Sequence, residues 1–410
     1  MTPSRLRWWV CALLLAATTV NYLDRVTLNQ TASDIKRAFG LRDVDYARLE
    51  SGFSLAFAAG AVLFGVVADK LGVWRTYPLA VLGWSLAGFL TGFAPTYWAV
   101  FACRVGLGLC EAGNWPCGIR TVRQVMPPAE RSLGNAFFQS GTGLGAMLTP
   151  LVVGACLWWA GPDHPAAWQV PFRAIGLIGL GWMALWLLTV PRDLVDRPPP
   201  PEPDARDGSF TEVLRDKRFW LLVVLVAGVN TPWHTFRVWL PQFLEHQRGF
   251  NKGDVQRFSF LYYAVADGGS WLAGGAVAVL AGRGMRLTPA RLLVFAVGVG
   301  LVAVGVLLPW HRQLGPTLTA AVVLTVGFGA LGLFAAYFAL SQDLSGKYQG
   351  TVTGVLGAAN WVYMAGVYEA QGRLADAGVG YDRILAGAWV PAVVALGVIL
   401  AAWPRGRGDP

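Results

Sequence analysis

Residues 8–31 read WWVCALLLAATTVNYLDRVTLNQT, an apolar run that carries two charged side chains, Asp24 and Arg25, near its end. A helix that crosses a bilayer needs about 20 mostly apolar residues, and a charge at its centre costs about 2.5–3.5 kcal/mol on insertion scales. Such charges normally face a polar interior and mark a substrate or proton path. The run predicts a first transmembrane helix rather than a secretory signal, because more apolar spans follow it.

Composition points to lipid as the solvent of the whole chain. The 410 residues are 55% hydrophobic and 14% charged, whereas soluble domains carry roughly 25% charged residues. The mean hydropathy is +0.47. The net charge of +9 comes from basic residues in short segments between apolar runs, with no basic helix interleaved by aromatics. This distribution argues against a nucleic-acid-binding protein.

Twelve segments of the chain are long and apolar enough to be spanning helices. The expected spans are 8–31, 46–67, 74–93, 97–125, 131–158, 167–189, 218–245, 252–281, 289–308, 314–341, 348–373 and 382–403. We therefore predict an all-α membrane protein of twelve transmembrane helices in two pseudo-symmetric six-helix bundles. The expected domains are an N-terminal bundle (1–190), a linker (191–217) and a C-terminal bundle (218–410).

The connection between the two halves is rich in proline and charge. It contains the run Pro198 to Pro201, which favours an extended linker. Ser209 and Glu212 resemble a capping box and predict a short interfacial helix before the seventh span. With twelve spans, the connecting segments lie alternately on the two sides of the membrane, and Lys and Arg are concentrated in those on the same side as the N-terminus. Both termini and the linker are therefore expected in the cytoplasm.

The turn between the second and third spans reads GVVADKLGVWR, residues 65–75. An acidic group at a helix end beside basic groups in a tight turn makes a compact charge cluster, and a glycine there permits close helix approach. The turn resembles the signature of the major facilitator superfamily, although Val73 stands where that signature has a basic residue. The resemblance implies the fold of that superfamily and a gating role for Gly65, Asp69, Lys70, Gly72 and Arg75.

Three further segments carry a closer resemblance: NYLDR (21–25), RVGLGLCEAGNWP (104–116) and FQSGTGLG (138–145). They are similar to the anion:cation symporter family, which includes bacterial hexuronate and galactonate transporters. The resemblance implies proton-coupled uptake of an organic anion, such as a hexuronate or aldonate, by alternating access. It also implies a monomer in the inner membrane of a bacterium.

The same resemblance assigns roles to individual residues. It implies that Asp24 and Glu111 bind the coupled protons, with Arg104 and Arg25 as their respective or exchanging ion-pair partners. It further implies substrate contacts from Tyr22, Arg25 and Thr142, and Gln139 is a candidate from the same motif. Each pair could instead be a structural ion pair, and Tyr22 and Thr142 could instead serve only helix packing.

Helix geometry agrees with this assignment. Tyr22 and Arg25, three residues apart, share one helix face, while Asp24 points about 100° away from Arg25 toward another neighbour. Arg104 and Glu111 are seven apart and also share a face. A substrate carboxylate that competes with a side-chain carboxylate for one arginine makes protonation and binding interdependent.

The second half offers weaker candidates for substrate contacts: His234, Arg237 and Asn360. Asn230, His234 and Arg237 follow i, i+4, i+7 spacing on one face of the seventh span. His234 could equally be a packing residue, and Asn360 could bridge helices. Asp267 could cap a helix or pair with Arg283.

Other classes of function find less support in the sequence. The four histidines are scattered and no catalytic set or metal-ligand spacing appears, so we expect no enzyme, cofactor or metal site. The five cysteines lie in apolar segments as small buried hydrophobes. The fifth span has glycines for close helix crossing and lacks the adjacent Gly-Pro of drug antiporters, which favours uptake over drug export. A sodium-coupled or uncoupled carrier of another small carboxylate and a non-transporting sensor remain alternatives.

Overall fold

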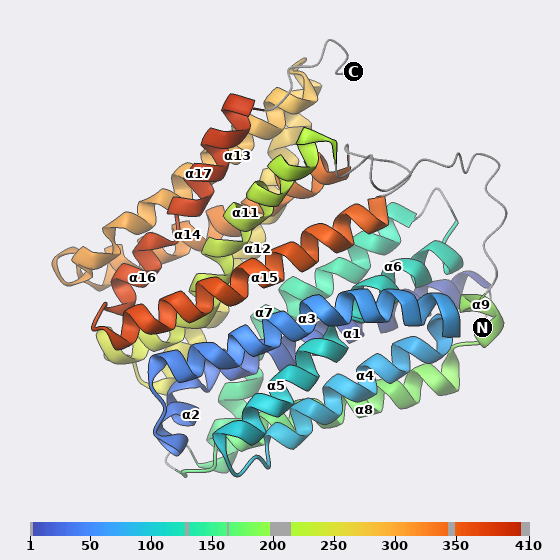
Figure 1. Ribbon diagram of the computed structural model, residues 1–410, viewed down its shortest axis with the longest axis horizontal. Coiled ribbons are helices and arrows are strands. Elements are labelled where there is room, and N and C mark those ends of the chain that lie inside the picture. Colours follow the sequence, from blue (N-terminus) through green and yellow to red (C-terminus); the bar gives the residue numbers. More distant parts are fainter. Residues whose placement is uncertain (1–2, 128–130, 162–163, 197–214, 343–348, 403–410) are drawn as a thin grey trace. The chain divides into compact units, whose positions relative to one another are not determined.

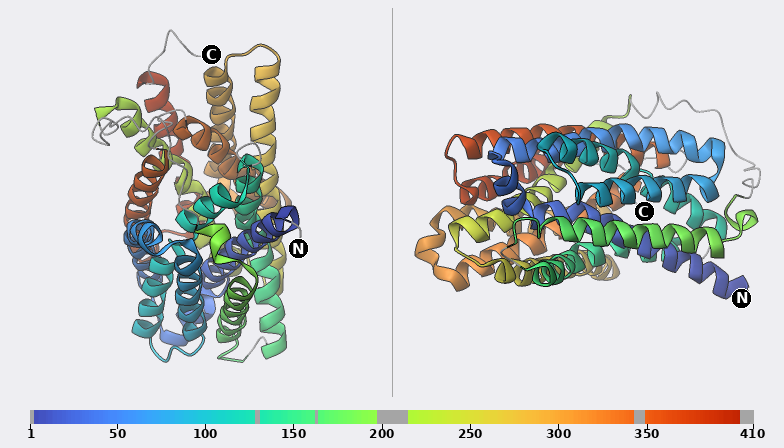
Figure 2. Two further views of the ribbon diagram at one scale, coloured as in Figure 1. Left: turned by 90° about the vertical axis from the view of Figure 1, so that its right-hand side faces the viewer. Right: turned by 90° about the horizontal axis from the view of Figure 1, so that it is seen from below.

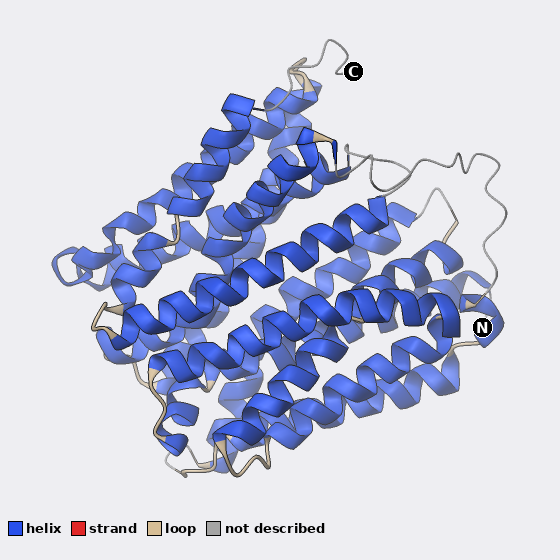
Figure 3. Cartoon of the chain, in the orientation of Figure 1, coloured by secondary structure: helices blue, strands red, loops and turns tan. Residues whose placement is uncertain are grey.

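Every element in the computed structural model is a helix, and no strand occurs in the part of the chain that it describes (Figure 3). The described residues are 3–127, 131–161, 164–196, 215–342 and 349–402. Most of the predicted linker, including the Ser209–Glu212 capping box, lies outside them. The predicted all-α class is confirmed.

Helices cover all six spans predicted in the first half of the chain (Figure 1). Their bounds are α1 Pro3–Gln30, α3 Asp43–Leu71, α4 Val73–Thr91, α5 Tyr97–Glu111, α6 Asn114–Val125, α7 Arg131–Ala160 and α8 Gln169–Thr189. A short helix that the apolar pattern does not predict, α2 (Ala32–Phe39), follows α1 and ends at Gly40 with φ 64°. A single helical turn, α9 (Arg192–Val195), follows α8.

Helices also cover the six spans predicted in the second half. Their bounds are α11 Lys217–Gln242, extended by the π-helical turn η2 Phe243–Gln247, α12 Lys252–Gly282, α13 Leu287–Ala303, extended by the 3₁₀ turn η3 Val304–Trp310, α14 His311–Gln342, α15 Gln349–Asp376, α16 Tyr381–Gly387 and α17 Val390–Ala402.

Two of the predicted spans are broken rather than continuous, and a proline stands in the first turn of the helix after each break. Span 97–125 divides between α5 and α6, and Pro116 lies in the first turn of α6. In an unbroken helix its ring would clash with the carbonyl of Ala112, four residues earlier. Span 382–403 divides in the same way, with Pro391 four residues after Gly387.

Eight helical stretches among the described residues meet both length and hydropathy requirements for a membrane span by themselves. α5 and α6 are too short to do so separately, at 15 and 12 residues. Together they cover the single predicted span 97–125.

By its internal contacts the chain divides into two compact units, Met1–Asp204 with Lys252–Phe260, and Ala205–Asn251 with Leu261–Pro410. The predicted domain bounds remain a prediction. In the first unit α1 packs along α7, α3 along α5, and α4 along both α5 and α8 (Figure 2). In the second unit α11 packs against α14, α15 and α17, and α13 packs along α14.

Glycines on α7 allow its close crossing with α1, as the sequence predicts. A Cβ added at Gly141 would lie 2.6 Å from the carbonyl oxygen of Leu15, and one at Gly145 would lie 2.6 Å from the Cβ of Tyr22. The crossing therefore brings the Gly141–Gly145 motif against the turn of α1 that precedes Asp24 and Arg25.

Candidate functional site

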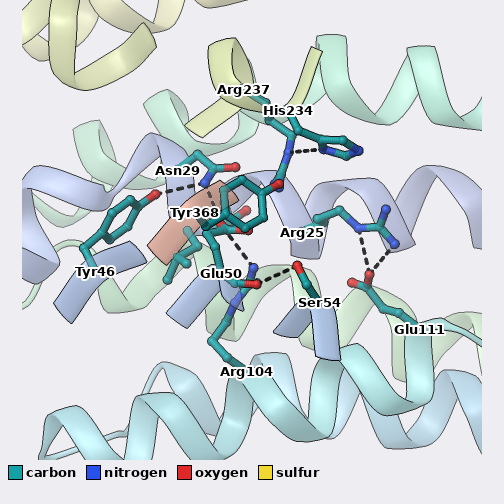
Figure 4. A network of polar contacts seen from close by, with 12 residues as sticks. Arg25, Asn29, Tyr46, Glu50, Ser54, Arg104, Glu111, His234, Arg237 and Tyr368 are labelled. Atoms are coloured by element: carbon teal, nitrogen blue, oxygen red, sulfur yellow. Dashed lines mark hydrogen bonds and ion pairs between the residues drawn. The ribbon is translucent and has the colours of Figure 1, made fainter. Parts of the chain in front are cut away.

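Arg25 on α1 and Glu111 on α5 form a buried ion pair (Figure 4). The Nε and Nη2 groups of Arg25 donate to the same oxygen, Oε2 of Glu111, at 2.9 and 2.7 Å. The guanidinium also lies over the rings of Tyr22 and Phe57, at 4.9 and 5.0 Å from their centres. The structure thus joins three residues that the resemblance groups together, Tyr22, Arg25 and Glu111.

Arg104 pairs with a carboxylate that the sequence analysis does not single out. Its Nη2 donates to Oε1 of Glu50 on α3 at 3.3 Å, and both side chains are buried. Asn29 of α1 also donates to Oε1 of Glu50, at 2.8 Å. The expected pairing of Arg104 with Asp24 is therefore wrong for this structure, because Arg104 reaches α3 instead of α1.

Glu50 escapes sequence reasoning because it lies one turn inside the predicted start of its span at residue 46. A carboxylate there is ordinarily solvated at a helix end. In the structure α3 begins earlier, at Asp43, and Glu50 is fully buried. Its spacing of four residues from Tyr46 and from Ser54 is the signal that could have found it, since all three lie on one helix face.

Asp24 is buried at 2% exposure, and neither of its carboxylate oxygens has a hydrogen-bond partner among the described residues. It lies against α4, where a Cβ added at Gly88 would meet Oδ1 at 2.5 Å. Glu111 and Arg104, both on α5, are close enough to act on it electrostatically. Asp24 points toward a different neighbour from Arg25, as its position on the helix predicts.

The candidates on α7 are not joined to these ion pairs by hydrogen bonds within the described residues. The Thr142 hydroxyl donates to the backbone oxygen of Gln139 in its own helix, at 2.9 Å. Gln139 is exposed and Thr142 is half-buried. Thr142 lies between Gly141, which packs against Leu15 and Thr18 of α1, and Gly145, which packs against Tyr22.

In the second unit Arg237 lies at the centre of a buried polar group. Its Nε donates to Nδ1 of His234 at 3.3 Å, and its Nη2 donates to the hydroxyl of Tyr368 on α15 at 3.0 Å. Since His234 accepts through Nδ1, its ring is placed as a neutral imidazole with the proton on Nε2. Trp361 packs on the His234 ring, with centres 5.1 Å apart.

Asn230 and Asn360, two further polar candidates from the second half, have no hydrogen bond to Arg237 among the described residues. Asn230 donates to the backbone oxygen of Val226 in its own helix, at 2.8 Å. Asn360 on α15 is buried, and its side-chain oxygen has no hydrogen-bond partner in the described part of the chain. Sequence spacing within α11 finds His234 and Arg237, whereas Tyr368 is 131 residues from Arg237 and is brought in only by packing.

The predicted gating turn is held by a residue from the end of the first half. Gly72 joins α3 to α4 with φ 77° and ψ 162°, a conformation that favours glycine. Oδ1 of Asp196, just after α9, accepts from the backbone N–H of Trp74 at 3.1 Å. The Trp74 indole donates to the backbone oxygen of Val190 at 2.9 Å.

The other members of the gating motif contribute less in this structure. Lys70 and Arg75 are exposed, and the side chain of Asp69 is outside the described part. A Cβ added at Gly65 would meet no atom of the described residues within 4 Å, so the predicted close helix approach at this glycine is not found among them. Asp267 accepts from the indole of Trp271 one turn later, at 3.1 Å, rather than pairing with Arg283.

Buried ion pairs within the predicted membrane spans, in a chain of long apolar helices that forms two helical units, are typical of a multi-pass membrane protein of the transporter class. The chain belongs to the Major Facilitator Superfamily, whose family model matches residues 14–367. The resemblance seen in the turn at residues 65–75 is thereby confirmed.

Two relatives show which group of transporters within the superfamily this chain is similar to. The hexuronate transporter of Escherichia coli (strain K12) is 27% identical over 93% of this chain and 90% of its own length. The galacturonate transporter of Dickeya chrysanthemi is 26% identical over 66% of this chain and 81% of its own length. Both are sugar-acid transporters by name, which confirms the resemblance to that group.

A solved structure supports the fold independently. The inward-facing, unoccupied form of a bacterial homologue of the human lysosomal transporter Spinster superposes with a TM-score of 0.78. It is 19% identical in sequence and covers 97% of this chain, while 96% of its own chain is matched. At this identity the likeness shows the fold alone.

Proposed function

We propose that this protein is a proton-coupled symporter that takes up an organic anion, a sugar acid such as a hexuronate or an aldonate, by alternating access. The names of its relatives support the substrate class. The buried cations Arg25, Arg104 and Arg237 support an anionic substrate, since a guanidinium binds a carboxylate through two parallel N–H groups.

The energetics of anion uptake favour coupling. Across an inside-negative membrane each elementary charge is worth about 2.3 kcal/mol per 100 mV, so a lone anion is driven outward. One proton per anionic charge removes this penalty, and further protons add a gain from the potential. Accumulation of a sugar acid therefore needs a cotransported cation, and if that cation is the proton, protonatable groups must lie on the transport path.

The observation that carries the proposal is the set of charges around α1 and α5. In the described part of the first unit, Glu111 pairs with Arg25, Glu50 pairs with Arg104, and Asp24 is close enough to Arg104 and Glu111 to interact with them electrostatically. Three carboxylates exceed two guanidiniums by one negative charge, and an uncompensated buried charge is costly. A bound proton removes this excess, which is the property that a symporter needs.

We assign roles to single residues from the family resemblance, and the contacts of Arg25 with Glu111 and Tyr22 support part of this assignment. Arg25 binds the substrate carboxylate in competition with Glu111, and Tyr22, Gln139 and Thr142 are its partners in substrate contact. Asp24, Glu111 and Arg104 carry the coupling.

The second unit adds its own contacts, and the gating turn changes state during transport. Arg237, His234 and Asn360 bind substrate in the second unit. Gly65, Asp69, Lys70, Gly72 and Arg75 form the turn, which the contact between Asp196 and Trp74 holds in this structure.

The test uses purified protein in proteoliposomes with an imposed pH gradient, inside alkaline. Hexuronates, aldonates and small carboxylates are offered in parallel, and uptake is measured with and without a protonophore. The proposal expects saturable, protonophore-sensitive accumulation of at least one sugar acid, recovered chemically unchanged. Failure to accumulate any member of the panel would contradict it.

The alternatives within the same superfamily predict different outcomes of that experiment. A sodium-coupled carrier would accumulate substrate under a sodium gradient and ignore the pH gradient. An uncoupled facilitator would equilibrate substrate without concentrating it, and a sensor would bind without flux. We further propose that the protein acts as a monomer in the bacterial inner membrane with both termini in the cytoplasm, which accessibility labelling of terminal tags would test.

A further inference from the structure

Glu50 is the buried carboxylate for which the proposed roles do not yet account. It is fully buried on α3, and its Oε1 accepts from two donors, Arg104 at 3.3 Å and Asn29 at 2.8 Å (Figure 4). Asn29 also donates to the hydroxyl of Tyr46, at 2.9 Å. The amide and the guanidinium thus share one acceptor oxygen.

Asp24, unlike Glu50, is a buried carboxylate that accepts no hydrogen bond from the described residues. It is as deeply buried as Arg104, yet its two oxygens have no hydrogen-bond partner within the described residues. The charged groups that act on it are Arg104 and Glu111, both from α5, and on α4 it lies against Gly88. Glu111 is already paired with Arg25, the neighbour of Asp24 on α1.

A buried carboxylate without donors is far less stable than the neutral acid in the same place. Arg104 is the cation that could stabilise the ionised form of Asp24, and in this structure it is directed to Glu50. The arrangement therefore stabilises the protonated form of Asp24 for as long as Glu50 holds Arg104.

We propose that Glu50 is a positioning residue that controls proton exchange at Asp24, by holding Arg104 while Asp24 is protonated and yielding it when Asp24 is ionised. When Asp24 releases its proton to water, Arg104 moves from Glu50 to Asp24, and Asn29 continues to donate to Glu50. Rebinding of the proton reverses the exchange. The O–H bond of Asp24 is the only covalent bond that is made or broken. This inference rests on the proposed function only where transport is the readout.

The first test compares the pH dependence of uptake in wild-type protein and Glu50→Gln. Loss of the Glu50 charge frees Arg104 to pair with Asp24, which favours the ionised acid. More acid is then needed to protonate Asp24, so the midpoint of the pH profile should move down by about one to three units, the range for an aspartate that gains an arginine partner. Ser54→Ala is the matched control, because it removes a hydrogen bond to the backbone oxygen of Glu50 and no charge.

A second variant should shift the midpoint in the opposite direction. Asn29→Leu removes the other donor to Glu50, so Glu50 depends more strongly on Arg104 and keeps it from Asp24. The midpoint should then rise. Because general loss of stability would not give shifts of opposite sign, the pair of variants separates a positioning role from a structural one, and Asn29→Leu decides the matter if Glu50→Gln does not fold.

A substrate-free readout separates this inference from the proposed function. Infrared difference spectra of purified protein against pH should show a carboxylic-acid carbonyl band that is absent in Asp24→Asn and that titrates at lower pH in Glu50→Gln. If no sugar acid is transported but this shift appears, the inference stands and the proposed function fails. An unchanged band and an unchanged pH midpoint in folded Glu50→Gln would overturn the inference.

Discussion

Arg25 and Glu111, 86 residues apart in the chain, form an ion pair in which two guanidinium N–H groups donate to a single carboxylate oxygen. Both side chains are shielded from solvent, at 2% and 0% exposure. The pair ties α1 to α5 through the site where the substrate carboxylate is proposed to bind. We therefore expect both residues to contribute to stability and to transport, and variants can separate these two contributions.

Glu111→Gln should retain substrate exchange and lose coupling. Glutamine keeps a hydrogen-bond acceptor for Arg25 but cannot bind and release a proton. Counterflow of labelled substrate between equal concentrations should stay within about twofold of wild type, whereas accumulation under a pH gradient should fall to the equilibrium level. Wild-type accumulation by this variant would show that Glu111 does not couple transport to protons.

Arg25→Ala should destabilise the protein by about 3–5 kcal/mol, because it leaves Glu111 buried without its ion-pair partner. The double variant Arg25→Ala with Glu111→Gln should recover most of this loss, since the remaining group is neutral. Thermal unfolding in detergent measures both effects. Substrate binding should stay absent in the double variant, and its return would exclude Arg25 from the binding site.

Tyr368→Phe should weaken substrate binding with little change in the maximal rate. The hydroxyl of Tyr368 accepts from Arg237 at 3.0 Å, and a hydrogen bond to a charged group contributes about 1.5–3 kcal/mol. Without this hydrogen bond the guanidinium of Arg237 is less well oriented toward the substrate, so the KM for uptake should rise about tenfold.

Tyr363→Phe on the same helix is the matched control for Tyr368. Its hydroxyl contacts Thr231 at 3.1 Å and not Arg237. Equal KM values for the two variants would show that the orientation of Arg237 does not matter for substrate.

Gly72→Ala should destabilise the first unit more than Gly40→Ala does. Both glycines have positive φ, but Gly72 combines φ 77° with ψ 162°, a region that costs other residues about 1–3 kcal/mol. An added Cβ would also meet the carboxylate of Asp196 at 2.5 Å, whereas at Gly40 it would meet nothing within 4 Å.

The comparison of melting temperatures checks this prediction, because Gly40→Ala reports the strain of a positive φ alone. We expect Gly72→Ala to lower the melting temperature by several degrees more. Equal losses would contradict the prediction, because neither the ψ of Gly72 nor the nearby carboxylate of Asp196 would then add to the cost of a Cβ.

Most of the helical architecture is predictable because the membrane imposes it. Each of the twelve apolar runs is covered by helix, since a backbone in lipid must satisfy its own hydrogen bonds. The breaks before Pro116 and Pro391 are also readable in principle from the missing N–H and the bulk of the proline ring. The polar segment that forms α2 carries no apolar signal, so it is found only in the structure.

The candidate site is predictable to the level of single helices. Tyr22 and Arg25 share a face by their spacing, as do His234 and Arg237, and the structure places each pair in contact. Partners on other helices are not predictable in this way. Arg104 pairs with Glu50 rather than Asp24, and Tyr368 reaches Arg237, because helix packing brings them together.

The sequence by itself determined that the chain is a membrane protein of apolar helices, that it carries charges within them, and that its motifs belong to a superfamily of transporters. These properties depend on composition and on spacing along one helix, where periodicity relates neighbouring side chains. Only the tertiary structure decided which carboxylates Arg25 and Arg104 bind and that Asp24 is left without a donor among the described residues. Ion pairing in a buried site depends on distances of a few ångströms between different helices, and those distances are set by packing.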